Sequence, residues 1–195
     1  DSASKVFKVC NELKNPQGSI AFSKSELFSK ELPKVEGGVV WSVFADNDFI
    51  YAGLQDGSIL VWMPDLTFFK KISEASSPVH AVLSDGSFLY AGSSDGKVRV
   101  FSKEDFSIQK TLEASASILS MAGDEEFIYA AASNGVVFVW EKQGFSLFKQ
   151  FSSSAESLAS IAVDSENLYV GGSDGNVSVW KKQGFAFERL LSQPS

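Results

Sequence analysis

One local pattern recurs four times along the chain at a nearly constant interval. Each copy contains one of the four tyrosines: FIYAGLQDGSILVW, FLYAGSSDGKVRVF, FIYAAASNGVVFVW and NLYVGGSDGNVSVW. Tyr51, Tyr90, Tyr129 and Tyr169 are separated by 39, 39 and 40 residues. A period of about forty residues is typical of architectures in which one small unit stacks on the next. The chain is therefore expected to fold as a series of similar units.

Each unit reads as four short strands joined by turns. In the first copy the strands are VVWSVFA, FIYAG, SILVW and TFFKKI. An Asp-Gly or Asn-Gly pair separates the second strand from the third in every copy: Asp56-Gly57, Asp95-Gly96, Asn134-Gly135 and Asp174-Gly175. Such pairs supply the positive φ angles of a tight hairpin, so each unit is predicted to be an antiparallel sheet.

The third strand of a copy is apolar on both faces, with Ile59 and Val61 on one side and Leu60 and Trp62 on the other. A sheet of this kind must be covered on both faces, which blades stacked around an axis achieve. The sequence therefore predicts an all-β fold, a β-propeller of four-stranded antiparallel blades. We expect complete blades at residues 39–78, 79–117, 118–157 and 158–195.

The first 38 residues form a degenerate copy of the unit. GSIAFSKSELFSKEL aligns with GSILVWMPDLTFFKKI as third and fourth strands, one residue shorter, and SKVFKVC fits a second strand, but a first strand is missing. We therefore expect a partial blade at residues 1–38 before the four complete ones. Either the chain closes as a small ring or it is part of a larger propeller. The larger ring is favoured, because bare apolar faces at the ends promote association.

Composition excludes several classes of function. The net charge of −7 argues against nucleic-acid binding, which usually starts from a basic surface. No apolar run approaches the roughly 20 residues that cross a bilayer, so no membrane association is expected. Cys10 is the single cysteine and cannot form an internal disulfide, which favours a cytoplasmic location. A leader segment removed before residue 1 is the alternative.

The blade order, the period and the closing stretches VRVF and VSVW resemble the WD-repeat family of β-propellers, whose members mostly serve as platforms for protein complexes. The family's Trp-Asp and Gly-His dipeptides are absent, so its buried His-Asp-Ser-Trp network is not expected. Blade stability should instead depend on apolar and aromatic packing, in keeping with 17 phenylalanines. The stretch LYVGGSDGNVSVW is also similar to blades of the pyrroloquinoline-quinone-type propellers.

The hairpin residues Asp56, Asp95, Asn134 and Asp174 carry oxygen atoms that metals prefer, but one such residue per blade spreads them around the ring. We therefore interpret them as turn residues and predict no metal site. His80 is the only histidine, and no nucleophile stands at a recognisable motif spacing from it. The sequence predicts neither catalytic residues nor a cofactor.

One position near the start of each blade varies strongly in size. Trp41, His80, Leu119 and Ala159 occupy it, whereas the next residue is always small. In WD-repeat propellers this position lies at the rim of the central channel, near the face where partners dock. The resemblance therefore implies partner binding by Trp41, His80 and Leu119. The alternative is that Trp41 packs between blades.

The expected function is a non-enzymatic protein–protein interaction scaffold that presents propeller loops to a protein or peptide partner. Self-association, or completion by further blades, is expected if the terminal faces are bare. A lectin-like propeller is one alternative, and it would need aromatic residues repeated in every blade loop. A blade segment of a quinoprotein is another, and it would need charged and metal-binding residues at the centre of a larger ring.

Overall fold

The computed structural model of the protein describes residues 38–191, which form sixteen β-strands in four separate sheets. Every sheet has four antiparallel strands, so the predicted all-β fold of four-stranded blades is confirmed. Within this range no helix is long and apolar enough to cross a membrane. The partial blade predicted at residues 1–38, including Cys10, lies outside the described residues apart from Gly38. The predicted blade boundaries stay a prediction.

We number the blades in chain order. Blade 1 consists of β1 (Val40–Ala45), β2 (Ile50–Leu54), β3 (Ile59–Trp62) and β4 (Phe68–Ile72). Blade 2 consists of β5 (Val79–Ser84), β6 (Phe88–Ser93), β7 (Lys97–Ser102) and β8 (Ile108–Glu113). Blade 3 consists of β9 (Ile118–Gly123), β10 (Phe127–Ala132), β11 (Val136–Glu141) and β12 (Leu147–Ser152). Blade 4 consists of β13 (Leu158–Val163), β14 (Asn167–Gly172), β15 (Val177–Lys181) and β16 (Ala186–Leu191).

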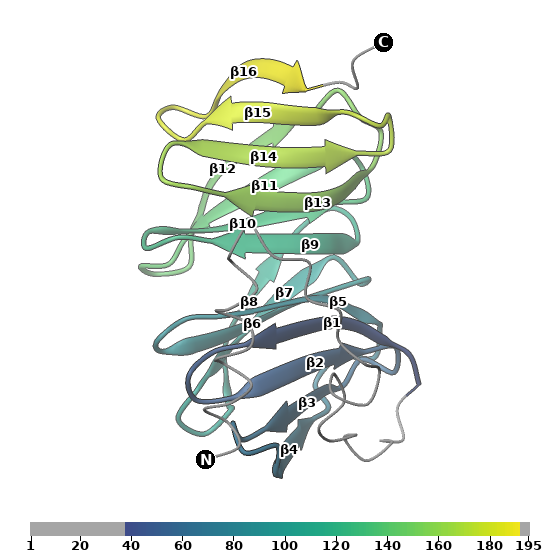
Figure 1. Ribbon diagram of the computed structural model, residues 1–195, viewed down its shortest axis with the longest axis vertical. Coiled ribbons are helices and arrows are strands. Elements are labelled where there is room, and N and C mark those ends of the chain that lie inside the picture. Colours follow the sequence, from purple (N-terminus) through teal and green to yellow (C-terminus); the bar gives the residue numbers. More distant parts are fainter. Residues whose placement is uncertain (1–37, 192–195) are drawn as a thin grey trace, which may run out of the picture.

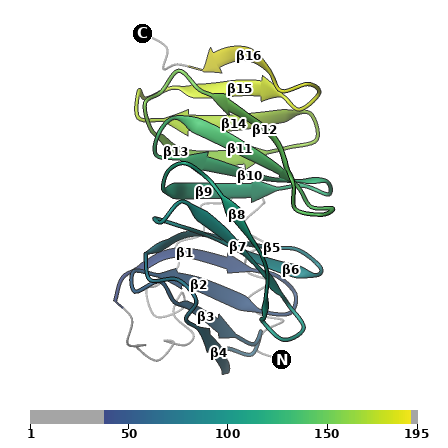
Figure 2. The ribbon, with the colours of Figure 1, turned by 180° about the vertical axis from the view of Figure 1, so that it is seen from behind.

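The blades follow one another as an open arc. Within each blade the strands are neighbours in chain order, and the first strands β1, β5, β9 and β13 contact each other in series along the inner edge. Blades 1 and 4 lie at opposite ends of the elongated molecule in both views (Figures 1 and 2). The face of blade 4 that points away from blade 3 therefore has no described blade against it.

The Asp-Gly and Asn-Gly pairs form the predicted hairpin turns. Gly57, Gly96, Gly135 and Gly175 all have positive φ angles, between 76° and 86°. In the first turn the Asp56 carboxylate accepts a hydrogen bond of 2.9 Å from the backbone N–H of Ser58. The prediction that these pairs shape tight turns is therefore confirmed by the backbone.

The apolar core lies in the three seams between consecutive blades. Each seam combines one face of a blade with the opposite face of the next, as where Tyr51 and Val61 of blade 1 meet Leu89 and Phe101 of blade 2. The tyrosines of the repeat are central to these seams, and Tyr51, Tyr90 and Tyr129 are 0% exposed. The repeated tyrosine thus marks the face that each blade turns toward its successor.

Blade 1 has a second apolar cluster on the face that points away from blade 2. It consists of the buried residues Ala52, Leu54, Leu60 and Trp62. Leu60 and Trp62 of β3 belong to this cluster, Ile59 and Val61 belong to the first seam, and all four residues of β3 are buried. Both faces of this strand are covered, as its sequence predicts.

Candidate functional site

A β-bulge interrupts the first strand of every blade at the position that the sequence singles out. Val40 pairs with Leu54 and Ser42 pairs with Gly53, so Trp41 has no partner on β2. The same register shift occurs at the equivalent residues His80, Leu119 and Ala159. A bulge re-aims the side chain of the extra residue. We call these four bulged residues, Trp41, His80, Leu119 and Ala159, the inner rim.

Trp41 and His80 are in contact across the first seam. Their ring centroids are 4.9 Å apart and their planes meet at 76°. His80 Nε2 also forms a hydrogen bond of 2.7 Å with Ser94 Oγ. Burial lowers the pKa of His80, which keeps the imidazole neutral at physiological pH. Trp41 nevertheless stays 51% exposed, so it contacts the neighbouring blade and still offers half of its surface to solvent.

The other two rim positions are smaller and extend the rim along the arc. Leu119 is half-buried and Ala159 is exposed. Because β5 and β9 pack side by side, Leu119 stands one blade beyond His80 on the same edge. The rim therefore runs from an aromatic residue through an imidazole and an aliphatic residue to a methyl group. It forms one graded surface and does not repeat a site in each blade.

The rim side chains suit apolar and aromatic contacts. Among residues 38–191, no group of three or more His, Cys, Asp and Glu side chains lies close enough to hold a metal ion. His80 forms its hydrogen bond with a serine hydroxyl, an arrangement that positions the ring edge-on to Trp41. What the geometry offers is a half-exposed indole supported by a fixed imidazole.

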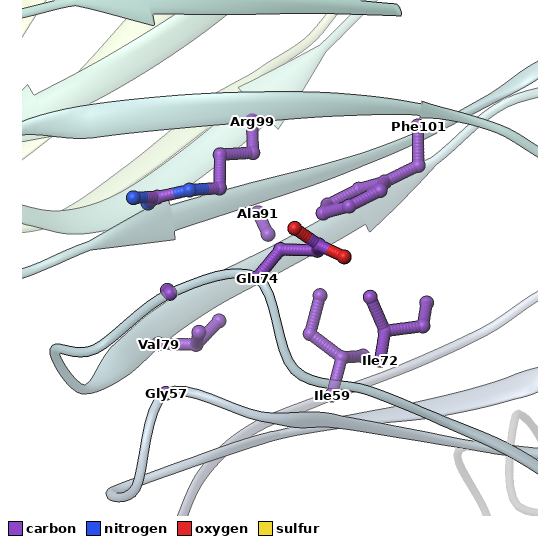
Figure 3. Close-up of a pocket in the computed structure, with 9 residues that line it drawn as sticks. Gly57, Ile59, Ile72, Glu74, Val79, Ala91, Arg99 and Phe101 are labelled. Atoms are coloured by element: carbon purple, nitrogen blue, oxygen red, sulfur yellow. The ribbon is translucent and has the colours of Figure 1, made fainter. Parts of the chain in front are cut away.

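A shallow depression lies between blades 1 and 2, beside the first seam. Figure 3 shows Ile59 and Ile72 on one side of it and Arg99 and Phe101 on the other. The space inside it is too small to hold even a water molecule, so it is not a ligand pocket. Arg99 is already paired with Asp95 at 2.7 Å. We interpret the depression as the edge of the packed seam.

A second repeated arrangement lies at the other end of the first strands, where β1 ends and Asp46 follows. An aspartate after each first strand accepts a hydrogen bond from the tyrosine hydroxyl of its own blade and forms an ion pair with a lysine of the next blade. We call this arrangement the Asp–Tyr–Lys link. The three described examples are Asp46–Tyr51–Lys103, Asp85–Tyr90–Lys142 and Asp124–Tyr129–Lys182.

The three links share a tight geometry. The lysine Nζ lies 2.8, 2.8 and 2.7 Å from the aspartate Oδ2 in the three seams. Burial raises the pKa of Asp46, Asp85 and Asp124, but hydrogen bonds from the lysines and neighbouring groups more than offset it, so the pKa of each lies below the ordinary value. Each carboxylate is therefore charged at neutral pH and ties two blades together.

An aromatic contact accompanies each link. A phenylalanine in the turn after the third strand reaches back to a phenylalanine of the preceding blade. The pairs are Phe49–Phe106 at 5.4 Å, Phe88–Phe145 at 5.1 Å and Phe127–Phe185 at 6.0 Å, with interplanar angles of 73°, 84° and 86°. The three turn residues have positive φ angles. Their packing compensates for a backbone conformation that costs a bulky residue about 1–2 kcal/mol.

The expectation that blade stability depends on apolar and aromatic packing is incomplete, because the Asp–Tyr–Lys links are polar. The sequence contains a signal for them. An aspartate precedes each repeat tyrosine by five residues, and Lys103, Lys142 and Lys182 follow their tyrosines by thirteen. Pro64 takes the equivalent place in blade 1. The link is hard to recognise in the sequence because each lysine forms its ion pair with the aspartate of the preceding blade.

Replacing Lys103 by methionine should lower the free energy of unfolding by about 2 kcal/mol, because it leaves the Asp46 carboxylate partly buried without its cation. The Lys103 side chain is 9% exposed and that of Asp46 is 19% exposed. Urea denaturation measures the loss. The double variant Lys103→Met/Asp46→Asn should lose less free energy of unfolding than the sum of the losses of the two single variants.

Lys97→Met is the matched control, because Lys97 pairs with Glu113 on the surface. That variant should lose less than about 0.5 kcal/mol. Equal losses for Lys97→Met and Lys103→Met would contradict the assigned role of the link.

Comparisons with known proteins identify a matching family and similar solved structures. Residues 41–165 match the family of the WD40 repeated domain. Among solved structures, the computationally designed Ika4 protein is 23% identical with a TM-score of 0.69, and the match covers 78% of this chain and 98% of that one. The computationally designed Ika8 protein is 16% identical with a TM-score of 0.73, and the match covers 80% of this chain and 50% of that one.

No curated protein matches the sequence significantly. The two solved structures share the propeller fold of this chain at low sequence identity. The family match is more specific, since it spans well over half of the 195 residues, from Trp41 at the inner rim into blade 4. From this match and the four repeated blades, the chain belongs to the WD40 repeat family.

Proposed function

We propose that the protein is a non-enzymatic interaction scaffold that binds a protein or peptide partner along the inner rim. The observation that carries the proposal is the bulge repeated in all four first strands, which turns four different side chains onto one edge. A repeated bulge with a varied side chain keeps the scaffold constant while the contact surface changes.

Trp41 is the anchor of the proposed interface. Tryptophan is among the residues that contribute most to protein interfaces, and a half-exposed indole held by a neighbouring ring loses little conformational entropy on binding. We expect a partner segment to cover Trp41 with an apolar side chain and to continue past His80 toward Leu119. WD40 repeat proteins are typically scaffolds of this kind, which supports the proposal.

No observation on residues 38–191 favours the lectin-like or the quinoprotein alternative. A lectin-like propeller would repeat its aromatic site in each blade, whereas the inner rim changes from tryptophan to alanine along the arc. The proposal includes a cytoplasmic location, which the single cysteine supports.

A phage-displayed library of random dodecapeptides tests the rim. Peptides selected on the wild-type chain should bind Trp41→Ala at least about tenfold more weakly, because losing an interface anchor costs about 1.4 kcal/mol or more. His80→Ala should weaken the same peptides by a smaller factor, since it removes the ring that fixes Trp41. Titration by fluorescence polarisation gives the dissociation constants.

Phe148→Ala is the control, because Phe148 is an equally exposed aromatic residue on the outer strand β12 of blade 3. It should leave the affinities unchanged. If Phe148→Ala weakens binding as much as Trp41→Ala, or if no selected peptide depends on Trp41, the inner rim is not the docking surface.

A further inference from the structure

The face of blade 4 that points away from blade 3, here called the forward face, differs from the forward faces of the other blades. Tyr169 is half-buried, whereas the other three repeat tyrosines are 0% exposed. Leu191, which pairs with Val177 at the end of the blade, is 45% exposed. Each other forward face packs into a seam. The forward face of blade 4 is therefore built to the same plan but lacks a described blade against it.

The Asp–Tyr–Lys link at this face has its aspartate and its tyrosine but no described lysine. Asp164 accepts a hydrogen bond of 2.8 Å from the Tyr169 hydroxyl, as in the other links. Among residues 38–191, no lysine Nζ contacts the Asp164 carboxylate, and Asp164 is exposed. Beside it, the buried Oδ1 of Asn167 has no hydrogen-bond partner in the described part of the chain. The Asp164 carboxylate thus stands where the other seams receive a lysine, and Asn167 takes the place of the phenylalanine found three residues after each of the other link aspartates.

The three complete links define what the missing group must be. In each of them the lysine is the second residue after the aromatic that closes the third strand: Phe101 and Lys103, Trp140 and Lys142, Trp180 and Lys182. A blade that completes the forward face of blade 4 should carry a lysine at that position.

The N-terminal copy carries this lysine. Phe22-Ser23-Lys24 is identical to Phe101-Ser102-Lys103, in the alignment that makes Phe22 the closing aromatic. Leu27 then falls at the position of Phe106, the residue that packs on the preceding blade. In the sequence, blade 1 has Pro64 where blades 2, 3 and 4 have the link lysine.

We propose that the forward face of blade 4 binds residues 18–28 of a second copy of this chain, with Lys24 Nζ paired to the Asp164 carboxylate. The segment precedes blade 1 in the sequence, and blades 1 and 4 lie at opposite ends of the molecule (Figures 1 and 2). The segment is therefore expected to bind blade 4 of a neighbouring copy and not blade 4 of its own chain. Such a head-to-tail contact closes a ring or extends a chain of copies.

The proposed contact pairs opposite charges and also covers apolar surface. Lys24 supplies the cation that the Asp164 carboxylate lacks, as Lys103 supplies it to Asp46 in the first seam. Phe22 and Leu27 supply apolar cover for the half-buried Tyr169. The inference is independent of the inner rim, which lies at the opposite end of the first strands.

Charge reversal tests the pairing. Light scattering across concentration should show association of the wild-type chain, and Asp164→Lys and Lys24→Asp should each raise the dissociation constant at least about tenfold, because each places two like charges in the contact. Mixed in equal amounts, the two variants should recover association to within about threefold of wild type, because every contact between the two different chains again joins a lysine to an aspartate. Glu125→Lys and Lys110→Asp, which change exposed residues by the same charges, should behave like wild type.

Cross-linking keeps the test decisive if Asp164→Lys folds poorly. In a Cys10→Ser background, Lys24→Cys and Asp164→Cys chains treated together with a short bismaleimide should give a covalent dimer, and Glu125→Cys in place of Asp164→Cys should not. A wild-type chain that stays monomeric at all concentrations overturns the proposal. So does a mixture that fails to recover association, because Lys24 and Asp164 would then meet within one chain or not at all.

Discussion

Replacing Trp140 by alanine should lower the free energy of unfolding by about 4 kcal/mol. Trp140 is 2% exposed and lies in the seam between blades 2 and 3. It stacks on Phe138 with centroids 5.5 Å apart and planes 13° from parallel. The substitution leaves a large cavity between two sheets that cannot collapse on it, since both are fixed by their own hydrogen-bonded ladders. Guanidinium denaturation followed by circular dichroism measures the loss.

Trp41→Ala is the matched control, because it removes the same side chain from a position that is 51% exposed. We expect a loss of about 1 kcal/mol or less, mainly from the edge contact with His80. If the two variants lose equal stability, the seam between blades 2 and 3 is not the core that its burial indicates. The control also decides whether Trp41 can be changed in binding experiments without unfolding the chain.

The blade fold follows from the sequence because one period governs three properties at once. The tyrosine spacing, the Asp-Gly turns and the two-faced apolar third strands all repeat with it. Few architectures bury both faces of short four-stranded sheets, so these patterns together specify the propeller. The structure bears this out in the seam positions of Tyr51, Tyr90 and Tyr129.

The sequence identifies the four inner-rim positions as equivalent but does not predict the bulge at each of them. Aligning the copies identifies Trp41, His80 and Leu119 as equivalent and variable. A bulge, however, is a register shift between paired strands, and composition does not indicate which strand carries the extra residue. The edge contact of Trp41 with His80 and the hydrogen bond of His80 to Ser94 depend on how blades 1 and 2 are set against each other.

The Asp–Tyr–Lys links are harder to predict because their residues belong to two blades. Asp85 and Lys142 are 57 residues apart in the sequence, and nothing local connects them. Only the order in which blades pack shows that a lysine serves the blade before its own. Once that order is known, aligning the copies shows that blade 1 has Pro64 at the position of the link lysine in the later blades.

The second prediction with a large expected effect compares two glycines of the hairpin turns. Gly135 and Gly175 occupy equivalent turns with φ angles of 78° and 77°. A Cβ on Gly135 would lie 2.4 Å from the carbonyl oxygen of Ala155, whereas a Cβ on Gly175 would meet no atom within 4 Å. The backbone conformation is therefore the same in both turns, and the space beside it differs.

Gly135→Ala should lower the free energy of unfolding by about 3 kcal/mol and Gly175→Ala by about 1 kcal/mol. Both variants incur the cost of a left-handed alanine, about 1–2 kcal/mol. Only Gly135→Ala must also displace the Ala155 carbonyl, and overpacking of this kind typically costs about 1–3 kcal/mol. The Ser153 N–H donates to the Gly135 carbonyl at 2.9 Å, so the loop that carries Ala155 is tied to the turn and has little freedom to move away. Urea denaturation of both variants measures the difference, and equal losses would mean that the turn of blade 3 is not packed against that loop.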